Sequence, residues 1–229
     1  MPQVNVIIPT IGKDRMIIDL LQQLEEQQDE ILRDIYVVDN GMSEQTRDDC
    51  RMFKHVKIVD GKGLGIYQMW NLGVMLVRSV FPHDYIAIFN DDIILDVDKF
   101  LSVLVEPLDT QTEVWAVCGN YDHRYFDGYY EEVIGTYKDD GFAGFCFVVK
   151  GEAYAEGLPF FEEFFNVWYG DDDLLHNIHK CGKAVAMTRD AWMTHIGGGS
   201  NTFGDRCRLV NEENAKDTEF YLRKWHNHD

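Results

Sequence analysis

Short apolar runs that each end in a polar or glycine-rich turn are the feature that most constrains the fold of this chain. Within the first 95 residues, four such runs alternate with segments whose apolar residues recur at helical spacing. Because parallel strands need a crossover connection, this alternation predicts an α/β fold with a mostly parallel central sheet flanked by helices. The predicted strands are Val4–Pro9, Ile35–Asp39, Val56–Asp60 and Tyr85–Phe89, and the predicted helices follow Asp14, follow Ser43 and span Ile66–Val80.

The residues that follow these strands predict a ligand-binding crevice. In open sheets of this kind, ligands bind beyond the carboxyl ends of the strands. Each predicted strand is followed there by polar or glycine-rich residues, so we expect four strand ends to converge on one crevice. These ends are Pro9-Thr10, Asp39-Asn40, Gly61–Gly65 and Asn90–Asp92.

The second half of the chain has a less regular pattern, which predicts a smaller, mixed half. We expect a helix that is capped by Asp171 and stops at Gly182, and a closing helix near Glu212–Trp225. Aromatic residues alternate from Arg124 to Tyr137. The other predicted elements are a helix over Val97–Val105 and strands over Val114–Cys118, Gly144–Val149, Ala184–Met187 and Ala191–Ile196.

The charge of the chain excludes one class of partner. The formal net charge is −19 over 229 residues, which repels the phosphates of nucleic acids and anionic membranes. We therefore expect no nucleic acid partner. The acidity is explained mainly by solubility, and a site that holds a divalent cation is the functional alternative.

The cysteines and the apolar runs predict a soluble, intracellular, cytoplasmic protein. The five cysteines are scattered without a Cys-x-x-Cys pair, which indicates buried free thiols in a reducing compartment. No apolar run approaches the length of a membrane span.

Two motifs at the predicted crevice are the candidates for chemistry. Asn90-Asp91-Asp92 offers oxygen ligands for a divalent cation, although an acidic pair after a strand is more often a turn or a helix cap. The Gly63–Gly73 stretch lacks the Gly-x-Gly-x-x-Gly spacing of a dinucleotide fingerprint. It is read equally well as a tight strand-to-helix turn and as a backbone surface for a nucleotide.

Taken in order along the chain, these motifs resemble those of the family 2 glycosyltransferases with the GT-A fold, especially rhamnosyltransferase-type members. The resemblance spans nearly the whole length, and its strength comes from the order and spacing of motifs that are weak alone. They are Val6–Thr10 with Arg15, Val37–Gly41, Gly63-x-Gly65 with Asn71-x-Gly73, Phe89–Asp92, Gly144, Gly170–Leu174, His195 and Tyr221–Trp225.

The resemblance implies an inverting, metal-dependent glycosyltransferase of the hexosyltransferase type. Its substrates would be a nucleoside-diphosphate sugar donor and a hydroxyl acceptor such as a glycan. Residues 1–229 would form a single GT-A catalytic domain. About residues 1–95 would be the nucleotide-binding half, about 96–205 the acceptor-side half and about 206–229 a C-terminal helical tail.

The resemblance also implies which residues bind the donor and the metal. Asn90 and Asp92 would stand at the two ends of an Asp-x-Asp motif, with Asp92 and His195 as metal ligands and Asp91 nearer the ribose. Because imidazole suits Mn²⁺ better than Mg²⁺, Mn²⁺ is the favoured cofactor. Lys62, Arg206 and Arg208 are candidate diphosphate contacts, and the predicted nucleotide-sugar contacts are Pro9, Thr10, Arg15, Asp39, Gly65, Asn71, Asn90, Asp91 and Gly144.

An inverting transfer needs a carboxylate base to accept the proton of the acceptor hydroxyl. The family's Glu-Asp pair maps onto Gly170-Asp171, so Asp171 is the implied base, and the missing Glu leaves Asp172 as a competitor. Without the resemblance, these acids would be read as stabilising a helix N-terminus. Trp168 and Tyr169, just before Asp171, are the predicted acceptor contacts.

Two other functions remain open from the sequence. A sugar-phosphate nucleotidyltransferase also uses a metal bound by Asp, but its glycine-rich first loop differs from Pro9–Lys13 of this chain. A non-catalytic module that binds a nucleotide sugar or carbohydrate is supported by the Gly at position 170.

Overall fold

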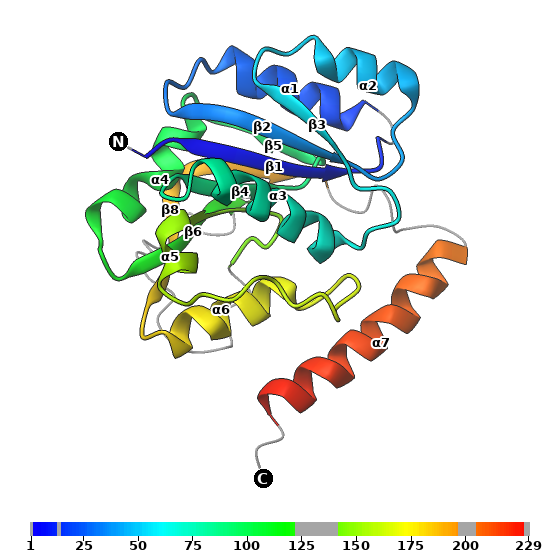
Figure 1. Ribbon diagram of the computed structural model, residues 1–229, viewed down its shortest axis with the longest axis vertical. Helices are drawn as coiled ribbons and strands as arrows, with labels where there is room; N and C mark the ends of the chain where they lie inside the picture. The colour runs from blue at the N-terminus through cyan, green and yellow to red at the C-terminus, as the bar shows by residue number, and fades with distance from the viewer. Residues whose placement is uncertain (1, 13–14, 122–141, 197–204, 227–229) are drawn as a thin grey trace.

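The central element of the computed structural model is an eight-stranded sheet with the strand order β3-β2-β1-β4-β7-β6-β8-β5 (Figure 1). The structure describes residues 2–12, 15–121, 142–196 and 205–226, without the side chains of Arg189 and residues 205–211. The strands are β1 (Val4–Thr10), β2 (Leu32–Asp39), β3 (Val56–Asp60), β4 (Tyr85–Phe89), β5 (Ile93–Leu95), β6 (Val114–Tyr121), β7 (Cys146–Lys150) and β8 (Ala184–His195).

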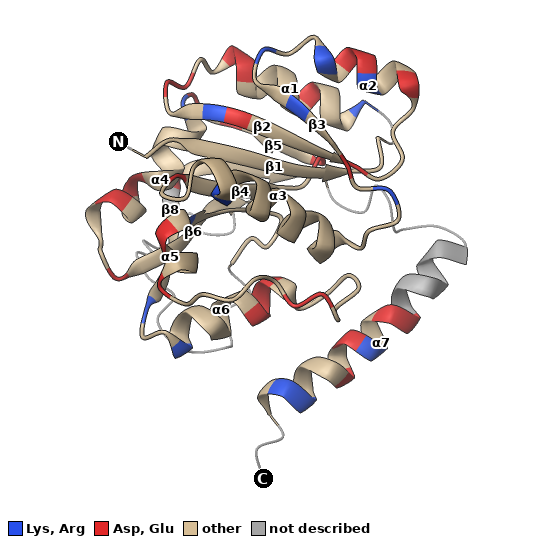
Figure 2. Cartoon of the chain, viewed as in Figure 1, with Lys and Arg blue, Asp and Glu red and all other residues tan. Residues whose placement is uncertain are grey.

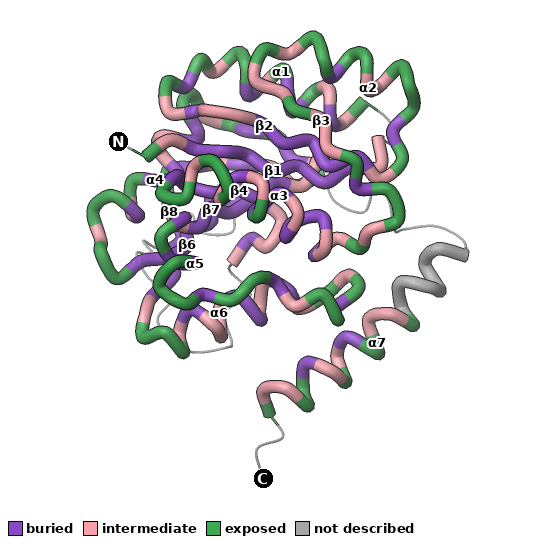
Figure 3. The backbone as a smooth tube through the Cα atoms, in the orientation of Figure 1, coloured by how far each residue is buried: buried purple, intermediate pink, exposed green. Residues whose placement is uncertain are grey.

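The first four strands confirm the predicted parallel arrangement. Strand β1 pairs in parallel with β2 and β4, and β2 pairs in parallel with β3. Every residue of β1 is buried, because α1 and α2 lie on one side of the sheet and α3 lies on the other (Figures 1 and 3). These helices are α1 (Met16–Glu26), α2 (Glu44–Arg51) and α3 (Ile66–Val80).

Two residues in the first half of the chain, Ser43 and Gly73, shape the ends and the packing of its helices. Ser43 caps α2, where its side chain accepts a hydrogen bond from the backbone N–H of Thr46 at 3.0 Å. Gly73 lies directly against Ile7, and a Cβ atom at this position would overlap that side chain. The glycine therefore lets α3 pack closely on β1.

The second half is mixed, as expected, because β7 runs antiparallel to both β4 and β6. The prediction of two strands between Ala184 and Ile196 is wrong, since β8 is one strand that pairs first with β6 and then with β5. Its register shifts between the partners of Cys118 and Asn120, so a bulge absorbs the polar residues that separated the two predicted strands. Its helices are α4 (Phe100–Thr110), α5 (Gly151–Ala155), α6 (Gly170–Lys180) and α7 (Asp205–Trp225).

Helix α6 begins two residues earlier than predicted. Its N-cap is Tyr169, in the left-handed region at φ 69°, so Asp171 lies in the first turn and is not the cap. The backbone N–H of Gly170 donates to the hydroxyl of Tyr67 at 3.0 Å, which takes the place of a side-chain cap. The predicted stop is confirmed, because Gly182 follows the helix with φ 69°.

Helix α7 is held to the segment before α6 by a buried carboxylate. Asp217 is 1% exposed and accepts hydrogen bonds from the backbone N–H groups of Asn166, Val167 and Trp168, at 2.9–3.0 Å. The side-chain amide of Asn166 adds a further bond at 2.9 Å. A single acid on α7 therefore fixes the backbone that leads to Asp171.

We expect Asp217→Ala to lower the free energy of unfolding by about 3 kcal/mol, because it leaves several buried N–H groups without an acceptor. Chemical denaturation of the variant and of Glu219→Ala, which removes an exposed acid two residues further on, measures this effect. A loss below about 1 kcal/mol, or an equal loss in both variants, would contradict the anchoring role.

The positions of the acidic residues and cysteines can be compared with what the composition predicts. Acidic residues are spread over α1 and α2 as well as over α6 and α7 (Figure 2), so the negative charge is not confined to one part of the described fold. Cys50, Cys118 and Cys146 are buried free thiols as predicted, whereas Cys181 is exposed. Within the described ranges, no helix is long and apolar enough to cross a membrane.

Candidate active site

The carboxyl ends of β1, β2 and β4 lie side by side and are joined by hydrogen bonds. The hydroxyl of Thr10 donates to Asp91 Oδ2 and accepts from the backbone N–H of Gly12 at 2.8 Å. The backbone N–H of Asn40 donates to the carbonyl of Thr10 at 2.8 Å. Thr10 therefore connects the end of β2 with the acidic motif after β4.

The glycine-rich turn after β3 joins the same edge. The Asn40 side chain donates to the carbonyl of Leu64 at 2.9 Å and accepts from the N–H of Gly63 at 2.8 Å. Gly65 is the N-cap of α3, and its N–H donates to the Gln68 side chain at 2.9 Å. The four strand ends thus meet at one edge of the sheet, as the sequence predicts.

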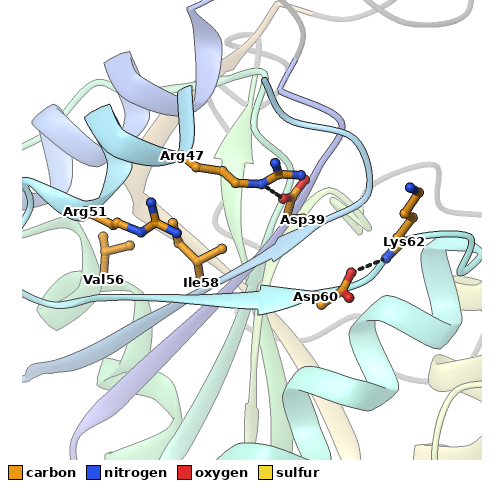
Figure 4. Close-up of a pocket in the computed structure, with 7 residues that line it drawn as sticks. All are labelled: Asp39, Arg47, Arg51, Val56, Ile58, Asp60 and Lys62. Atoms are coloured by element: carbon orange, nitrogen blue, oxygen red, sulfur yellow. Dashed lines mark hydrogen bonds and ion pairs between the residues drawn. The ribbon is translucent and has the colours of Figure 1, made fainter. Parts of the chain in front are cut away.

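Asp39 is held as a carboxylate at the end of β2. Its Oδ1 accepts the N–H groups of Gly41 and Met42, at 2.8 and 2.7 Å, and its Oδ2 accepts from Arg47 Nε. Burial acts to raise the pKa of Asp39, but these three donors hold it below its ordinary value. A pocket of about 470 Å³ opens here, lined by Asp39, Arg47, Arg51, Val56, Ile58, Asp60 and Lys62 (Figure 4).

The acidic motif meets His195 across the antiparallel pairing of β5 with β8. Ile93 lies opposite His195 in the ladder, and the N–H of Ile196 donates to the carbonyl of Asp92 at 2.9 Å. This register brings His195 Nε2 to 3.3 Å from Asp92 Oδ1. The structure therefore brings together the two residues that we predicted as metal ligands.

The side chains of Asn90 and Asp92 have oxygen lone pairs that could bind a cation. Asn90 Oδ1 and Asp92 Oδ1 are buried, and neither accepts a hydrogen bond from the described part of the chain, although His195 Nε2 lies 3.3 Å from Asp92 Oδ1. Among the residues that the structure describes, no three His, Cys, Asp or Glu side chains are grouped so that they could hold a metal ion. A divalent cation that keeps positions for phosphate oxygens needs only one or two protein ligands, so the donor set fits one.

Asp91 has a different environment from its neighbours. Burial raises its pKa, while the hydrogen bond from Thr10 acts in the opposite direction. Its side chain thus ties β4 to β1, which leaves Asp92 as the acid that faces His195.

Gly144 and Phe145 separate Asp171 from this acidic motif. A Cβ atom on Gly144 would overlap Asp171 Oδ2. The next residue, Phe145, accepts the N–H of Asn90 at 2.8 Å, and its ring stacks on His195 at 3.9 Å between centroids. Because consecutive Cα atoms are only about 3.8 Å apart, Asp171 borders the site of Asn90 and His195.

Asp171 and Asp173 have separate roles in the first turn of α6. Burial raises the pKa of Asp171 above its ordinary value of 3.8. Asp173 is 2% exposed, accepts a hydrogen bond from Trp225 Nε1 at 2.8 Å and forms an ion pair with Lys224 Nζ, also at 2.8 Å. Asp173 therefore anchors the C-terminal helix.

Position 170, where the family has Glu, has no room for a side chain in this structure. The ring of Tyr67 lies where a side chain at position 170 would begin, so a Cβ atom on Gly170 would overlap it. The Tyr67 hydroxyl donates to the carbonyl of Val167 at 2.9 Å and accepts the N–H of Gly170. Tyr67 thus fixes the start of α6 from α3.

We expect Gly144→Ala to lower kcat of the sugar transfer that the family resemblance implies by about 10²-fold, because the added methyl displaces the Asp171 carboxylate by an ångström or more. Steady-state kinetics checks this expectation, and thermal unfolding of the same sample shows whether the variant is folded. A folded variant with the activity of the parent would contradict the contact.

Three other residues that we predicted as nucleotide-sugar contacts have the following surroundings in the structure. Asn71 is buried and donates to the Phe161 carbonyl and the Glu163 side chain, both at 2.9 Å, while its Oδ1 accepts the N–H of Phe161. Its amide is therefore used in packing. Arg15 is the exposed N-cap of α1, and Pro9 is buried within β1.

The predicted acceptor contacts divide into one exposed and one packed ring. Trp168 is 46% exposed, whereas the Tyr169 ring stacks on Tyr221 at 4.6 Å and its hydroxyl bonds Thr218. Of the two rings, Trp168 is the more exposed. The aromatic stretch at Arg124–Tyr137 and the side chains of Arg206 and Arg208 lie outside the described residues.

Sequence reasoning missed three residues of this region. Arg47 lies one turn after the Ser43 cap, Phe145 follows the predicted Gly144, and Tyr67 lies two residues after Gly65. Their closeness to recognised motifs was the signal that could have found them. Their contacts depend on the tertiary fold, so the sequence alone did not show their partners.

Comparison with known proteins places the chain among sugar-transferring enzymes. The model of the family described as "Glycosyl transferase family 2" matches residues 5–167. A search of curated protein sequences found no match.

Three solved structures share the fold, each below 20% identity. The mannosyltransferase PcManGT from Pyrobaculum calidifontis, in complex with GDP-Man and Mn²⁺, has a TM-score of 0.67 at 18% identity over 95% of this chain and 64% of its own. GalNAc-T7 with UDP, GalNAc and Mn²⁺ has a TM-score of 0.65 at 12% identity over 84% of this chain and 43% of its own. Glucosyl-3-phosphoglycerate synthase from Mycobacterium tuberculosis, with Mn²⁺, UDP and glucosyl-3-phosphoglycerate, has a TM-score of 0.63 at 15% identity, over 97% and 79%. This chain thus spans less than two thirds of the first two proteins.

Proposed function

Because the chain belongs to glycosyl transferase family 2, we propose that it moves a sugar from a nucleoside-diphosphate sugar to a hydroxyl acceptor, a glycan in the simplest case, with inversion at the anomeric carbon. About residues 1–95 would bind the donor and about residues 96–205 the acceptor. The C-terminal tail would anchor the acceptor side through Asp173 and Asp217.

The observation that carries the proposal is the placement of Asp171 beside the acidic motif. Gly144 touches Asp171, and the next residue, Phe145, touches both Asn90 and His195. An inverting displacement needs a base on one side of the sugar and a binding site for the leaving diphosphate on the other. Two successive residues thus separate the two groups that the reaction requires.

Asp171 would act as the base. As the acceptor oxygen attacks the anomeric carbon, the Asp171 carboxylate takes the hydroxyl proton, and the bond from that carbon to the nucleoside diphosphate breaks. Burial raises the pKa of Asp171, which makes it a stronger base than an exposed carboxylate. Asp172 remains the competing base, and the exposed ring of Trp168 would stack on the acceptor.

Asp92 and His195 would hold a divalent cation, and Asn90 would contact it directly or through water. When bound, the cation neutralises the charge of the leaving diphosphate. Mn²⁺ is proposed in preference to Mg²⁺, because one ligand is an imidazole and because Mn²⁺ is present in the three similar structures.

The position of Tyr67 weakens the alternative hypothesis that the chain is a non-catalytic binding module. That hypothesis was based on the absence of the family's Glu before Asp171. The ring of Tyr67 fills this place and its hydroxyl supports the backbone of Gly170, so Asp171 keeps a defined position without the Glu. This support favours an enzyme over a binding module.

The test is a reaction of the full chain with a panel of sugar nucleotides, Mn²⁺ and a mixture of hydroxyl acceptors. Mass spectrometry is expected to detect a free nucleoside diphosphate and a glycoside, and NMR an inverted anomeric configuration. Release of pyrophosphate would support a nucleotidyltransferase. Donor binding by calorimetry without turnover of any acceptor would support a binding module.

A further inference from the structure

The imidazole of His195 has an aromatic ring packed flat against its face. The ring of Phe145 stacks on it, with 3.9 Å between the centroids and 9° between the planes. The two residues belong to different segments, since His195 is the last residue of β8 and Phe145 directly precedes β7. The tertiary fold therefore builds this contact at the site that we propose for the cation.

A second ring holds Phe145 from the side. Tyr121, the last residue of β6, meets the Phe145 ring edge-on, with centroids 5.1 Å apart and planes at 86°. Tyr121 is 8% exposed, and it pairs with Met193 of β8, two residues before His195. Aromatic contacts of this kind are favourable beyond the area that they bury. The three rings thus form one row that ends at the imidazole.

The plane of the His195 ring determines what the residue can bind. The lone pair of a neutral imidazole nitrogen lies in the plane of the ring, so this plane sets the direction in which a cation can be ligated. Rotation about χ2 of histidine is soft, because this torsion has no sharp staggered wells. The side chain is 25% exposed, so burial alone does not fix its orientation. The flat contact with Phe145 restricts the rotation and keeps Nε2 at 3.3 Å from Asp92 Oδ1.

We propose that Phe145 is a positioning residue for the cation site: its ring fixes the plane of the His195 imidazole, and Tyr121 in turn fixes the ring of Phe145. The ligand pair is then oriented before a cation binds, so little side-chain freedom is lost on binding. The inference rests on the proposed function, in which Asp92 and His195 hold the cation.

Substitution of the Phe145 side chain isolates the effect of its ring. The backbone of this residue also supports the site, because its carbonyl accepts the N–H of Asn90 at 2.8 Å. That backbone group remains in Phe145→Leu, which keeps an apolar side chain but removes the flat ring. Phe145→Tyr keeps the ring and is the conservative variant. A difference between the two variants therefore reports on stacking.

The test measures binding of Mn²⁺ alone to the full chain, from the loss of the electron paramagnetic resonance signal of free Mn²⁺. The net charge of −19 attracts cations to other acidic positions as well. Pulsed measurements of the bound Mn²⁺ therefore identify the fraction that is coupled to a histidine nitrogen. His195→Ala should abolish this coupling, which assigns it to the site.

Phe145→Leu is expected to weaken the nitrogen-coupled binding of Mn²⁺ about tenfold, the lower end of the losses typical for residues that orient metal ligands. Phe145→Tyr should bind within about threefold of the parent, because the stacked ring is kept. Phe160→Leu is the matched control, since Phe160 is also a partly exposed ring that stacks on another ring, that of Tyr154 at 5.7 Å. It should bind Mn²⁺ as the parent does.

Tyr121→Leu tests the second contact of the row. It should weaken the same binding about threefold, and it should add little in a chain that already carries Phe145→Leu, because Tyr121 acts through the Phe145 ring. Thermal unfolding of each sample shows whether the variant is folded. If Phe145→Leu does not fold, Tyr121→Leu decides the question, because it leaves the Phe145 ring in place.

The outcomes separate this inference from the proposed function. Unchanged nitrogen-coupled binding in folded Phe145→Leu, or in Tyr121→Leu where the former does not fold, would overturn the positioning role and leave the cation site standing. An equal loss in Phe145→Tyr or in Phe160→Leu would also overturn it, because the effect would not depend on the stacked ring. Absence of nitrogen-coupled Mn²⁺ in the parent would overturn both the cation site and this inference.

Discussion

Asp171→Asn is expected to lower kcat by about 10²–10⁴-fold while the affinity for the donor changes little. The amide keeps the size of the carboxylate but cannot accept the proton of the acceptor hydroxyl. Because Asp171 faces Gly144 and not the pocket at Asp39, donor binding should survive. Kinetics with the identified donor and acceptor, together with calorimetry of the donor alone, measures the two quantities separately.

Asp172→Asn decides between the two candidate bases. If Asp171 is the base, Asp172→Asn should keep kcat within about tenfold of the parent, since it leaves the proton acceptor in place. The reverse result, a large loss in Asp172→Asn and a small one in Asp171→Asn, would assign the base to Asp172.

The pH dependence of the parent enzyme adds an independent readout on Asp171. The base must be ionised to work, so the rate should rise with pH through its pKa. Because burial raises that pKa, the acidic limb of the profile should lie above pH 3.8, the ordinary value for the group. The same limb should be absent from the residual activity of Asp171→Asn.

Asp92→Asn is expected to remove most of the dependence of donor binding on Mn²⁺ and to lower kcat/KM by about 10²-fold or more. The substitution replaces a charged ligand by a neutral one at the position that faces His195. Calorimetry of the nucleoside diphosphate with Mn²⁺ and with EDTA gives the metal-dependent part of the affinity.

The control for this experiment is Asp98→Asn, which removes the same charge from an exposed residue close in the sequence. It should bind donor and Mn²⁺ as the parent does. Full metal dependence in Asp92→Asn would show that the cation is held elsewhere. An equal loss in both variants would indicate a general effect of charge.

The sequence predicted the first half of the fold well because its signals are local. Strands β3 and β4 and helix α3 have the predicted bounds, since each run of apolar residues is bounded by glycine or polar residues. The errors in the predicted strands occur where tertiary contacts determine the secondary structure. The polar residues 188–190 separated two predicted strands, yet the pairing with β6 and β5 continues β8 through them as a bulge. The three-residue β5 is too short to have a periodic signal.

The candidate site was predictable in its residue types and less so in its contacts. Resemblance to the family selected both Asp92 and His195, and their 3.3 Å approach depends on an antiparallel pairing that the sequence did not show. For Asn71, the motif gave the residue type but not the direction of the side chain. The amide of Asn71 forms hydrogen bonds with the backbone of Phe161.

The overlap between Tyr67 and Gly170 has a consequence for exchanging parts between relatives. A segment that carries Glu at position 170 cannot be grafted into this chain alone, because its side chain would collide with the Tyr67 ring. The two positions lie 103 residues apart and must be replaced together, Glu at one with a smaller side chain at the other. A chimaera made from this chain therefore needs positions 67 and 170 from the same parent.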